Sequence, residues 1–567
     1  MPLPNDPQVS KGELHIPLDD DFDLPASSVG GSVNRYEAAS EFMPRSIWTE
    51  RILAMRSEVE RTVPILGKWW LGSLAIISTI AALALRLVAL DRLPGEMYGD
   101  IAIVYEYVAA IRARQWPTYF VLSAGPLYHY LITPLVSLAG FDFLGLKVAS
   151  VTVSLAVLAG LFALGRELVD PELGLLAVFV GGVSSWLLIF SRLGNSQILV
   201  PVLTAAALYF CARVVRRGSM RDALLCGAIS TLGLYVYPQS FLLAPVIFVI
   251  LLWFYFTRQG VSRGHLIAFV SISALCALLF VRIVIRDPHT FFHGYIGSKL
   301  APETGIAATF LANTLHSMLA LHVHGDSNFR SNPASLPELD PLSGLLFLLG
   351  LAFWLRPERR HLSPLLLIPL LLLQLPSILV LGFPQEVPSA SRMLAIAPLA
   401  YLLVASGIWW PLHALRRYLW QTHVAALVVL LIILVLNSYR YFTVYADGLP
   451  DHNTPFGRLI ADYLDGLPAN THAFIVDCCW GQAGQPEPKG IQYGGQTVVS
   501  HGLVELHSLD LTCPRLQSLP QPSVLIWEPD VALPAFALGV CPGLLRPETH
   551  MSAEGLPVFR SSAASSP

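Results

Sequence analysis

The chain has 567 residues, of which 54% are hydrophobic and only 13% are charged. Soluble domains carry roughly a quarter charged residues, so this composition disfavours a soluble enzyme. The 36 Lys and Arg residues against 39 Asp and Glu residues leave a net charge of −3, so there is no basic excess to hold DNA or RNA, and nucleic acid is not an expected partner.

Residues 1–68 form a polar N-terminal segment of mixed charge. A signal peptide places a short apolar stretch close to the first methionine, whereas the first apolar run here begins at Trp69. We therefore expect a cytoplasmic tail that is mostly disordered, with one surface helix near Glu41 to Val63.

Apolar runs of membrane-spanning length follow, the first from Trp69 to Leu90. About 20 apolar residues cross a hydrocarbon core of roughly 30 Å at about 1.5 Å per residue. The sequence thus predicts a mainly α-helical, polytopic membrane domain over residues 69–445, with about eleven spans. The others are Phe143–Leu164, Pro171–Phe190, Gln197–Ala212, Ala223–Tyr237, Ser240–Phe256, Leu266–Ile285, Pro341–Leu355, Pro364–Gly382, Met393–Trp410 and Val424–Tyr441.

The distribution of basic residues predicts the orientation, because Lys and Arg concentrate in cytoplasmic loops. If the short apolar stretch Pro126–Gly140 does not span, the basic loops after it face the cytoplasm; if it spans, they face outward. We interpret it as an interfacial or re-entrant helix. The N-terminus is then cytoplasmic, and outer loops 91–142 and 286–340 are extracytoplasmic. The basic loops contain Arg213, Arg216, Arg217 and Arg221, then Arg258 and Arg263, then Arg356, Arg359 and Arg360, and finally Arg416 and Arg417.

Residues 446–567 lose the membrane composition and alternate short apolar runs with turn residues. The segments HAFIVDCCW and PSVLIWEP are typical of strands, and FGRLIADYLDGL of an amphipathic helix, so we predict a small extracytoplasmic α/β domain. Cysteines in an exported domain commonly form disulfides, and one or two fit here with the pairing left open. The four are Cys478, Cys479, Cys513 and Cys541.

Carboxylates are absent from the middle of the predicted spans. Secondary transporters usually bind coupling ions with groups at mid-membrane, so this class is disfavoured. Polar residues gather instead at the outer ends of the spans, which predicts a site at that membrane boundary. They include Asp100, Arg192, Asn195, Tyr235, Tyr237, Gln239 and Arg392.

Each of these side chains has a functional and a plainer interpretation. Asp100 begins an expected interfacial helix, where it could act as a general base toward a hydroxyl or simply cap the helix. Arg192 and Arg392 can pair with a lipid phosphate or extend to ordinary headgroups. Tyr237 can line a sugar site or anchor the chain at the interface.

A metal site receives little support from the sequence. His289 and His293 have the i, i+4 spacing that permits a metal ion, but no carboxylate or cysteine completes a ligand set. We therefore predict no cofactor and assign no metal ligand.

Seven short motifs follow one another along the chain in a characteristic order. They are GD at 99–100, GPLYHYL at 125–131, GRELVDPELG at 165–174, SRLGN at 191–195, GLYVYPQSF at 233–241, LDPLSGLLFLLGL at 339–351 and PSASRMLAIAPLAYLLVASG at 388–407. Their order resembles that in the GT-C membrane glycosyltransferases related to protein O-mannosyltransferases and aminoarabinose transferases, which are similar to glycosyltransferase family 39. The resemblance covers about Trp69 to Tyr441 and implies a GT-C fold.

The resemblance also implies an activity. Such enzymes transfer a sugar from a polyprenyl-phosphate-linked donor to an acceptor on the extracytoplasmic face of the membrane. Asp100 would match the family's catalytic aspartate, which activates the acceptor for direct, inverting attack at the anomeric carbon. The residues expected to bind substrate are Tyr128, Arg192, Asn195, Tyr237 and Arg392.

The sequence departs from the family pattern at three positions. Ile101 stands where a Glu often follows the aspartate, and Asn195 stands where an acid is often found, so a two-acid metal site is less expected. Ala124 or Gly125 replaces a Lys before Pro-Leu, which puts phosphate binding on Arg192 and Arg392.

Two alternatives stay open at this point. A lipid-linked glycan transporter or flippase would need a substrate path that continues to the cytoplasmic face. A non-catalytic cell-envelope scaffold would leave no cavity beside Asp100. The resemblance names neither the sugar nor the acceptor, which could be protein, lipid or polysaccharide.

Overall fold

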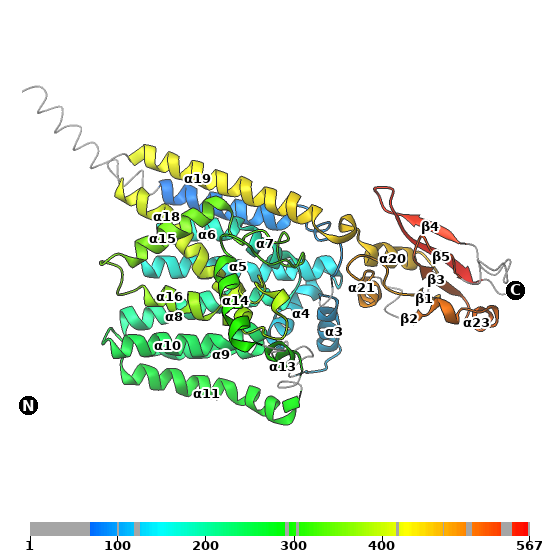
Figure 1. The fold of residues 1–567 in the computed structure, drawn as a ribbon, viewed down its shortest axis with the longest axis horizontal. Coiled ribbons are helices and arrows are strands. Elements are labelled where there is room, and N and C mark those ends of the chain that lie inside the picture. The colour runs from blue at the N-terminus through cyan, green and yellow to red at the C-terminus, as the bar shows by residue number, and fades with distance from the viewer. Residues whose placement is uncertain are drawn as a thin grey trace, which may run out of the picture. The chain divides into compact units, whose positions relative to one another are not determined.

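The structure is a computed structural model in which a helical membrane domain precedes a small five-stranded sheet (Figure 1). It describes residues 69–98, 101–117, 125–289, 294–301, 305–415, 419–468, 470–494, 502–533 and 547–564. The predicted tail 1–68, Asp100 and Cys541 lie outside these residues. The predicted fold class, a polytopic helical membrane protein with a small C-terminal domain, is confirmed.

Seven helices in the described part of the chain are long and apolar enough to cross a membrane. They are Trp69–Leu87, α5 (Phe143–Leu168), Ser196–Arg217 with η2 (Ser196–Ile198) and α8 (Leu199–Arg217), Pro238–Phe256 with η4 (Pro238–Leu242) and α10 (Leu243–Phe256), α11 (Arg263–Arg286), Leu394–Ala414 with η6 (Leu394–Ile396) and α18 (Ala397–Ala414), and Trp420–Tyr445 with most of α19 (Leu419–Tyr439). An eighth span results if α6 (Pro171–Val183) and α7 (Ser185–Arg192), bent by 63°, count as one.

The other predicted spans form shorter helices. These are α9 (Met220–Thr231), which η3 (Leu232–Tyr235) follows, α15 (Pro341–Leu355), and α16 (Pro364–Leu372) with α17 (Leu375–Ile378). α15 has the bounds of its predicted run and ends before Arg356, because Pro357 follows and a proline disfavours helix at the residue before it. The stretch 126–140 forms α4 (Leu127–Ala139), which at 13 residues is too short for a straight span.

Glycines allow two of the helices to cross closely. A Cβ atom on Gly350 of α15 would lie 1.8 Å from the Leu403 carbonyl oxygen of α18, and one on Gly407 would lie 2.0 Å from the Leu346 carbonyl oxygen. Small residues at such crossings are typical of membrane helices, which gain stability from close packing. The crossing is further joined by a hydrogen bond from Trp354 Nε1 to Ser406 Oγ (3.0 Å).

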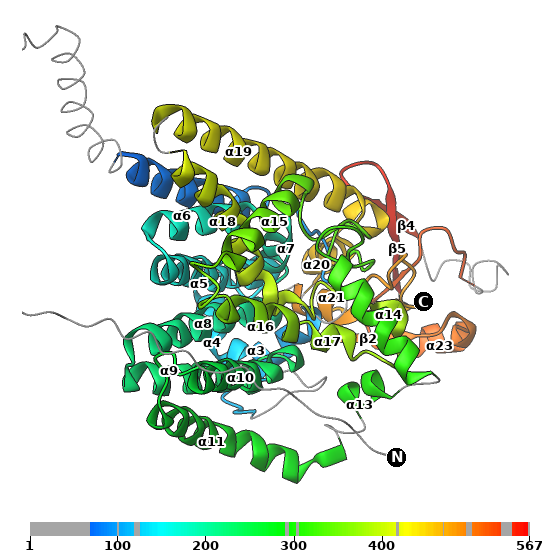
Figure 2. The same ribbon diagram turned by 60° about the vertical axis from the view of Figure 1, so that its left-hand side comes forward.

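The outer segments carry short helices of their own. The helix expected to begin at Asp100 is present as α3 (Ile101–Arg112), and it packs on α4. Its apolar residues Ile101, Val104, Tyr105, Val108 and Ile111 are buried in the protein. Farther along, α13 (Tyr295–Leu300) and α14 (Ile306–Leu319) follow α11, and α14 packs against α17 (Figure 2). The segment between α17 and α18 contains η5 (Pro384–Glu386).

The C-terminal sheet has the strand order β2-β1-β3-β5-β4. The strands are β1 (His472–Val476), β2 (Leu503–Leu506), β3 (Ser523–Trp527), β4 (Glu548–Met551) and β5 (Pro557–Ala564). β1 pairs in parallel with β2 and β3, and β5 is antiparallel to β3 and β4.

Helices cover both faces of this sheet. Residues of α20 (Phe456–Asp465) and α21 (Pro488–Gly494) pack on one face, and α23 (Cys513–Gln517) packs on the other. Two of these elements, β1 and β3, coincide with the strands predicted from the sequence, and α20 coincides with the predicted amphipathic helix. Cys478 and Cys479, directly after β1, form a disulfide with each other.

Candidate functional site

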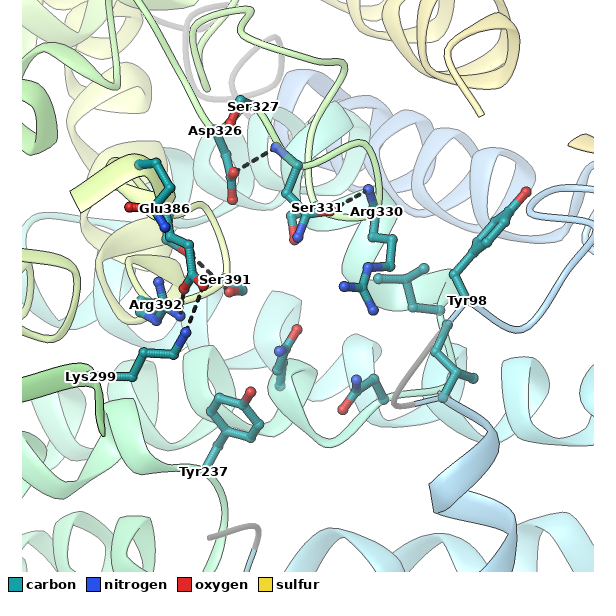
Figure 3. A pocket seen from close by; sticks show the side chains of 17 residues that line it. Tyr98, Tyr237, Lys299, Asp326, Ser327, Arg330, Ser331, Glu386, Ser391 and Arg392 are labelled. Carbon is teal, nitrogen blue, oxygen red and sulfur yellow. Dashed lines mark hydrogen bonds and ion pairs between the residues drawn. The ribbon is translucent and has the colours of Figure 1, made fainter. Parts of the chain in front are cut away.

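A cavity of about 320 Å³ lies where segments distant in the sequence meet (Figure 3). Asn195 and Gln197 contribute from the turn before α8, and Tyr237 contributes from the residue before η4 and α10. The cavity therefore lies at the N-terminal ends of these two spans. Its lining is Tyr98, Ile101, Leu193, Asn195, Gln197, Tyr237, Lys299, Asp326, Ser327, Asn328, Arg330, Ser331, Gln385, Glu386, Ser389, Ser391 and Arg392.

Two cationic side chains share one carboxylate in the cavity wall. Lys299 Nζ lies 2.6 Å from Glu386 Oε1, and Arg392 Nη2 lies 2.5 Å from Glu386 Oε2. Partial burial raises the pKa of Glu386, but the hydrogen bonds from Lys299 and Arg392 outweigh burial and hold that pKa below its usual value. Lys299 also lies over the ring of Phe383, 4.0 Å from its centroid, which helps to orient the ammonium.

A second carboxylate, Asp326, is buried in the same wall. Its two oxygens accept hydrogen bonds from the amides of Asn328 and Ala390, each at 2.8 Å. Burial raises the pKa of Asp326 to about 6, against the effect of these two amides. The bond to Ala390 ties the loop before α15 to the segment that carries Arg392, so both loops have a fixed relation to the cavity.

Three of the predicted substrate-binding residues, Asn195, Tyr237 and Arg392, line this cavity together. Asp100 lies outside the described residues, but Tyr98 and Ile101, on either side of residues 99–100, both line the cavity. Of the other polar residues expected to gather at one end of the spans, Tyr235 and Gln239 do not line the cavity.

Arg192 has a different environment from the one expected. It is fully buried and does not line the cavity. Its guanidinium donates hydrogen bonds to four carbonyl oxygens at the end of the first span, at distances from 2.6 to 3.2 Å, which leaves only Nε without a partner. The last carbonyls of a helix lack partners within it, so Arg192 supplies them. The acceptors are Leu85, Val88, Ala89 and Leu93.

Tyr128 is likewise buried away from the cavity. It is fully buried in α4, within the core of the membrane domain, and its ring meets His129 edge-on. The contacts of Tyr128 and Arg192 thus favour roles in packing and in helix termination over direct contact with a substrate.

The sequence did not single out Lys299, Asp326, Arg330 or Glu386, all of which line the cavity. Two signals were available in retrospect. The loop 286–340 is long and polar, which is common for segments that cover a site. Glu386 also lies in the same short segment as Arg392, which the sequence predicts to bind substrate.

Among the residues that the structure describes, no group of three or more His, Cys, Asp or Glu side chains could hold a metal ion. His293, one half of the pair weighed as a metal site, lies outside them, as does Asp100.

The fold and the site define a class of protein: a multi-pass membrane protein with a polar, partly cationic cavity at one end of its spans. Residues 123–285 match the family model described as dolichyl-phosphate-mannose-protein mannosyltransferase. A search of curated proteins finds no match.

The structure is similar to ArnT from Cupriavidus metallidurans, solved bound to undecaprenyl phosphate. The two chains are 14% identical, with a TM-score of 0.54 over 86% of this chain and 97% of that one. The apo state of the same protein gives 13% identity and a TM-score of 0.53, over 87% of this chain and 98% of that one. The chain therefore has the fold of the GT-C superfamily of membrane glycosyltransferases, as its motifs predicted.

Proposed function

We propose that the chain is a glycosyltransferase that moves a sugar from a polyprenyl-phosphate-linked donor to an acceptor on the extracytoplasmic face of the membrane. The observation that carries the proposal is the cavity at the span ends, where Lys299, Arg330 and Arg392 meet the residues beside Asp100. A volume of about 320 Å³ is within the range of small-molecule sites. Support for a lipid phosphate comes from the fold shared with ArnT, which was solved with undecaprenyl phosphate.

Lys299 and Arg392 are the proposed ligands of the donor phosphate. Their charged ends converge on one point, at present held by the carboxylate of Glu386. Arg binds phosphate through paired N–H groups and Lys binds it as a compact charge, so the two together suit an anionic oxygen cluster. Lys299 thus takes the phosphate-binding role of the family Lys that is missing before Pro126. Arg192 is no longer assigned to the phosphate, because its donors bind backbone carbonyl oxygens.

Asp100 is the proposed general base. It takes the proton from the acceptor nucleophile as that atom attacks the anomeric carbon, and the bond from this carbon to the phosphate oxygen breaks. The electron pair leaves on the lipid phosphate, whose growing charge Lys299 and Arg392 stabilise. Direct attack inverts the anomeric centre. In this proposal these cationic side chains, and no metal ion, balance the charge of the phosphate, while Asn195 and Tyr237 contact the sugar.

The proposal also gives the chain an orientation. Arg216, Arg258 and Arg359 lie at or just beyond the ends of α8, α10 and α15, on the side opposite the cavity. Basic residues concentrate on the cytoplasmic side of a membrane. The cavity then faces outward. We keep the predicted division into a cytoplasmic tail (1–68), a membrane domain (69–445) and an outer domain (446–567).

Two measurements test this function, one on the purified full-length protein and one in cells. Undecaprenyl phosphate binding measures the donor site, and mass analysis of envelope glycans in cells complemented with each variant measures transfer. We expect Asp100→Asn to abolish transfer while binding stays within about twofold of wild type, because the base does not hold the phosphate. Lys299→Gln and Arg392→Gln should each weaken binding about tenfold or more.

Arg258→Gln is the matched control, since it removes one positive charge at the opposite end of the spans. It should leave both measurements unchanged. Full transfer by Asp100→Asn would refute the mechanism, and wild-type protein that does not bind undecaprenyl phosphate would refute the donor class.

A further inference from the structure

A second, larger cavity of about 740 Å³ lies at the other end of the same helices. Arg216 contributes from the end of α8, and Gln259 and Gly260 contribute from the turn between α10 and α11. The first cavity is lined by residues that precede α8 and α10. Because α8 has 19 residues, at about 1.5 Å each, the two cavities are separated by roughly the thickness of a hydrocarbon core.

The floor of this second cavity is held in a fixed shape. Gly260 has a φ of +72°, and a Cβ atom there would lie 2.0 Å from the Val215 carbonyl oxygen, so the turn after α10 fits tightly against α8. His265, in the first turn of α11, joins the neighbouring segments. Its Nδ1 accepts a hydrogen bond from the Ser262 amide (3.0 Å), and its Nε2 lies 3.1 Å from the Gly218 carbonyl oxygen. The turn that contributes Gln259 and Gly260 to the cavity is therefore held against the end of α8.

The charge of its wall is mainly positive. Arg216 and Arg359 line it, against one carboxylate, Glu358, which lies 3.4 Å from Arg356 Nε. The Arg359 guanidinium lies over the rings of Phe353 and Trp354, 5.2 and 5.9 Å from their centroids, which restricts its direction.

The two guanidinium groups repel each other across this wall. Partial burial lowers the pKa of Arg359, and the charge of Arg216 lowers it further. The carboxylate of Asp170 opposes this effect, but its oxygens already accept hydrogen bonds from Trp409 Nε1 and from the Leu173 amide. An anion placed between Arg216 and Arg359 would relieve the repulsion.

We propose that this cavity binds the phosphate headgroup of an anionic phospholipid, in the membrane leaflet opposite the candidate donor site. Apolar side chains of Leu168, Val215 and Leu362 line the cavity beside the cationic ones, which matches the boundary between a headgroup and its acyl chains. A free phosphate has the same charge chemistry but makes no use of this apolar wall or of a position at the ends of spans. The site is independent of sugar transfer.

Native mass spectrometry of the detergent-purified full chain tests the proposal with three probes: phosphatidylglycerol, phosphatidylcholine and inorganic phosphate. Wild-type protein should retain phosphatidylglycerol about tenfold better than the zwitterionic lipid. The double variant Arg216→Gln/Arg359→Gln should lose about tenfold in phosphatidylglycerol affinity. Arg258→Gln/Arg360→Gln removes the same charge at the same end of the helices, from residues that do not line the cavity, and should stay within about twofold of wild type.

Three outcomes would overturn the proposal. Equal retention of the two lipids by wild-type protein would remove the preference for an anionic lipid, and this comparison requires no variant to fold. An equal loss in both double variants would indicate a general surface charge effect. Displacement of phosphatidylglycerol by an equimolar amount of inorganic phosphate would assign the cavity to a free anion.

Discussion

Glu386 occupies the place between Lys299 and Arg392 that the proposed donor phosphate would take. All three side chains are partly or largely buried, so the carboxylate and an incoming phosphate compete for the same donors. Bringing a second anion to this point requires the Glu386 side chain to move aside or to share the two cations. In the proposed function, the charge of Glu386 therefore limits donor affinity.

Replacing Glu386 with Gln should strengthen the binding of undecaprenyl phosphate about fivefold, the equivalent of about 1 kcal/mol, because the two cations lose an internal competitor. Isothermal or fluorescence titration of the purified protein measures the change. Asp462→Asn, which removes a charge from the exposed ion pair with Arg458, is the control and should have no effect. Weaker binding by Glu386→Gln would show that the carboxylate orients the cations and does not compete for them.

At the scale of elements, the crossing of α15 and α18 positions both loops of the candidate site. α15 follows the loop that carries Asp326, and α18 follows the segment that carries Arg392. The two glycines at the crossing allow each backbone to reach the other, and no Cβ atom fits there without a shift. The close approach of α15 and α18 therefore fixes the distance between the loop that carries Asp326 and the segment that carries Arg392.

Gly407→Ala should therefore destabilise the protein by about 1–3 kcal/mol, as expected for overpacking in a tight interior. The thermal unfolding midpoint in detergent measures this loss. Gly72→Ala is a matched substitution in the first span, where a Cβ atom would meet nothing within 4 Å, and it should not lower the midpoint. Equal midpoints for the two variants would mean that the helices can separate at little cost.

At the scale of the whole molecule, the loop after the first span joins the membrane domain to the C-terminal domain. The oxygens of Glu96 accept hydrogen bonds from the amides of Gly457 (2.6 Å) and Met97 (2.8 Å). Asn453 accepts a hydrogen bond from the Gly95 amide (2.6 Å). Burial raises the pKa of Glu96 to about 7, and it outweighs the two amide hydrogen bonds that favour the charged form.

This raised pKa predicts that stability falls as pH rises. The folded protein holds the Glu96 proton more tightly than the unfolded chain, so the stabilisation is complete below about pH 4.5 and is lost as pH rises to about 7. It amounts to about 3 kcal/mol at most. Between pH 4.5 and 8, the unfolding midpoint of the wild type should fall more steeply with pH than that of Glu96→Gln, because only the wild type loses this contribution.

Glu106→Gln provides the control for that series. Glu106 forms an ion pair with Lys489 (2.8 Å) and is partly exposed, so its replacement should leave the slope unchanged. Parallel curves for wild type and Glu96→Gln would contradict the prediction.

The sequence by itself determined the membrane class, most of the spans and three of the residues that line the candidate cavity. Apolar runs are local signals, so α5, α8 and α11 could be located from composition alone. Asn195, Tyr237 and Arg392 flank such runs, and the ends of spans necessarily meet at a membrane boundary, which is why these three residues could be grouped in advance.

Only the tertiary structure decided which side chains share a cavity and which close a helix. Lys299, Asp326 and Glu386 belong to segments between the spans, and the paths of these segments depend on long-range contacts, such as the bond between Asp326 and the Ala390 amide. Arg192 lies in a motif beside the site, yet the unpaired carbonyls at the end of the first span take up its donors. A hydrogen-bond donor binds the acceptors that folding brings to it, and a linear sequence does not specify those acceptors.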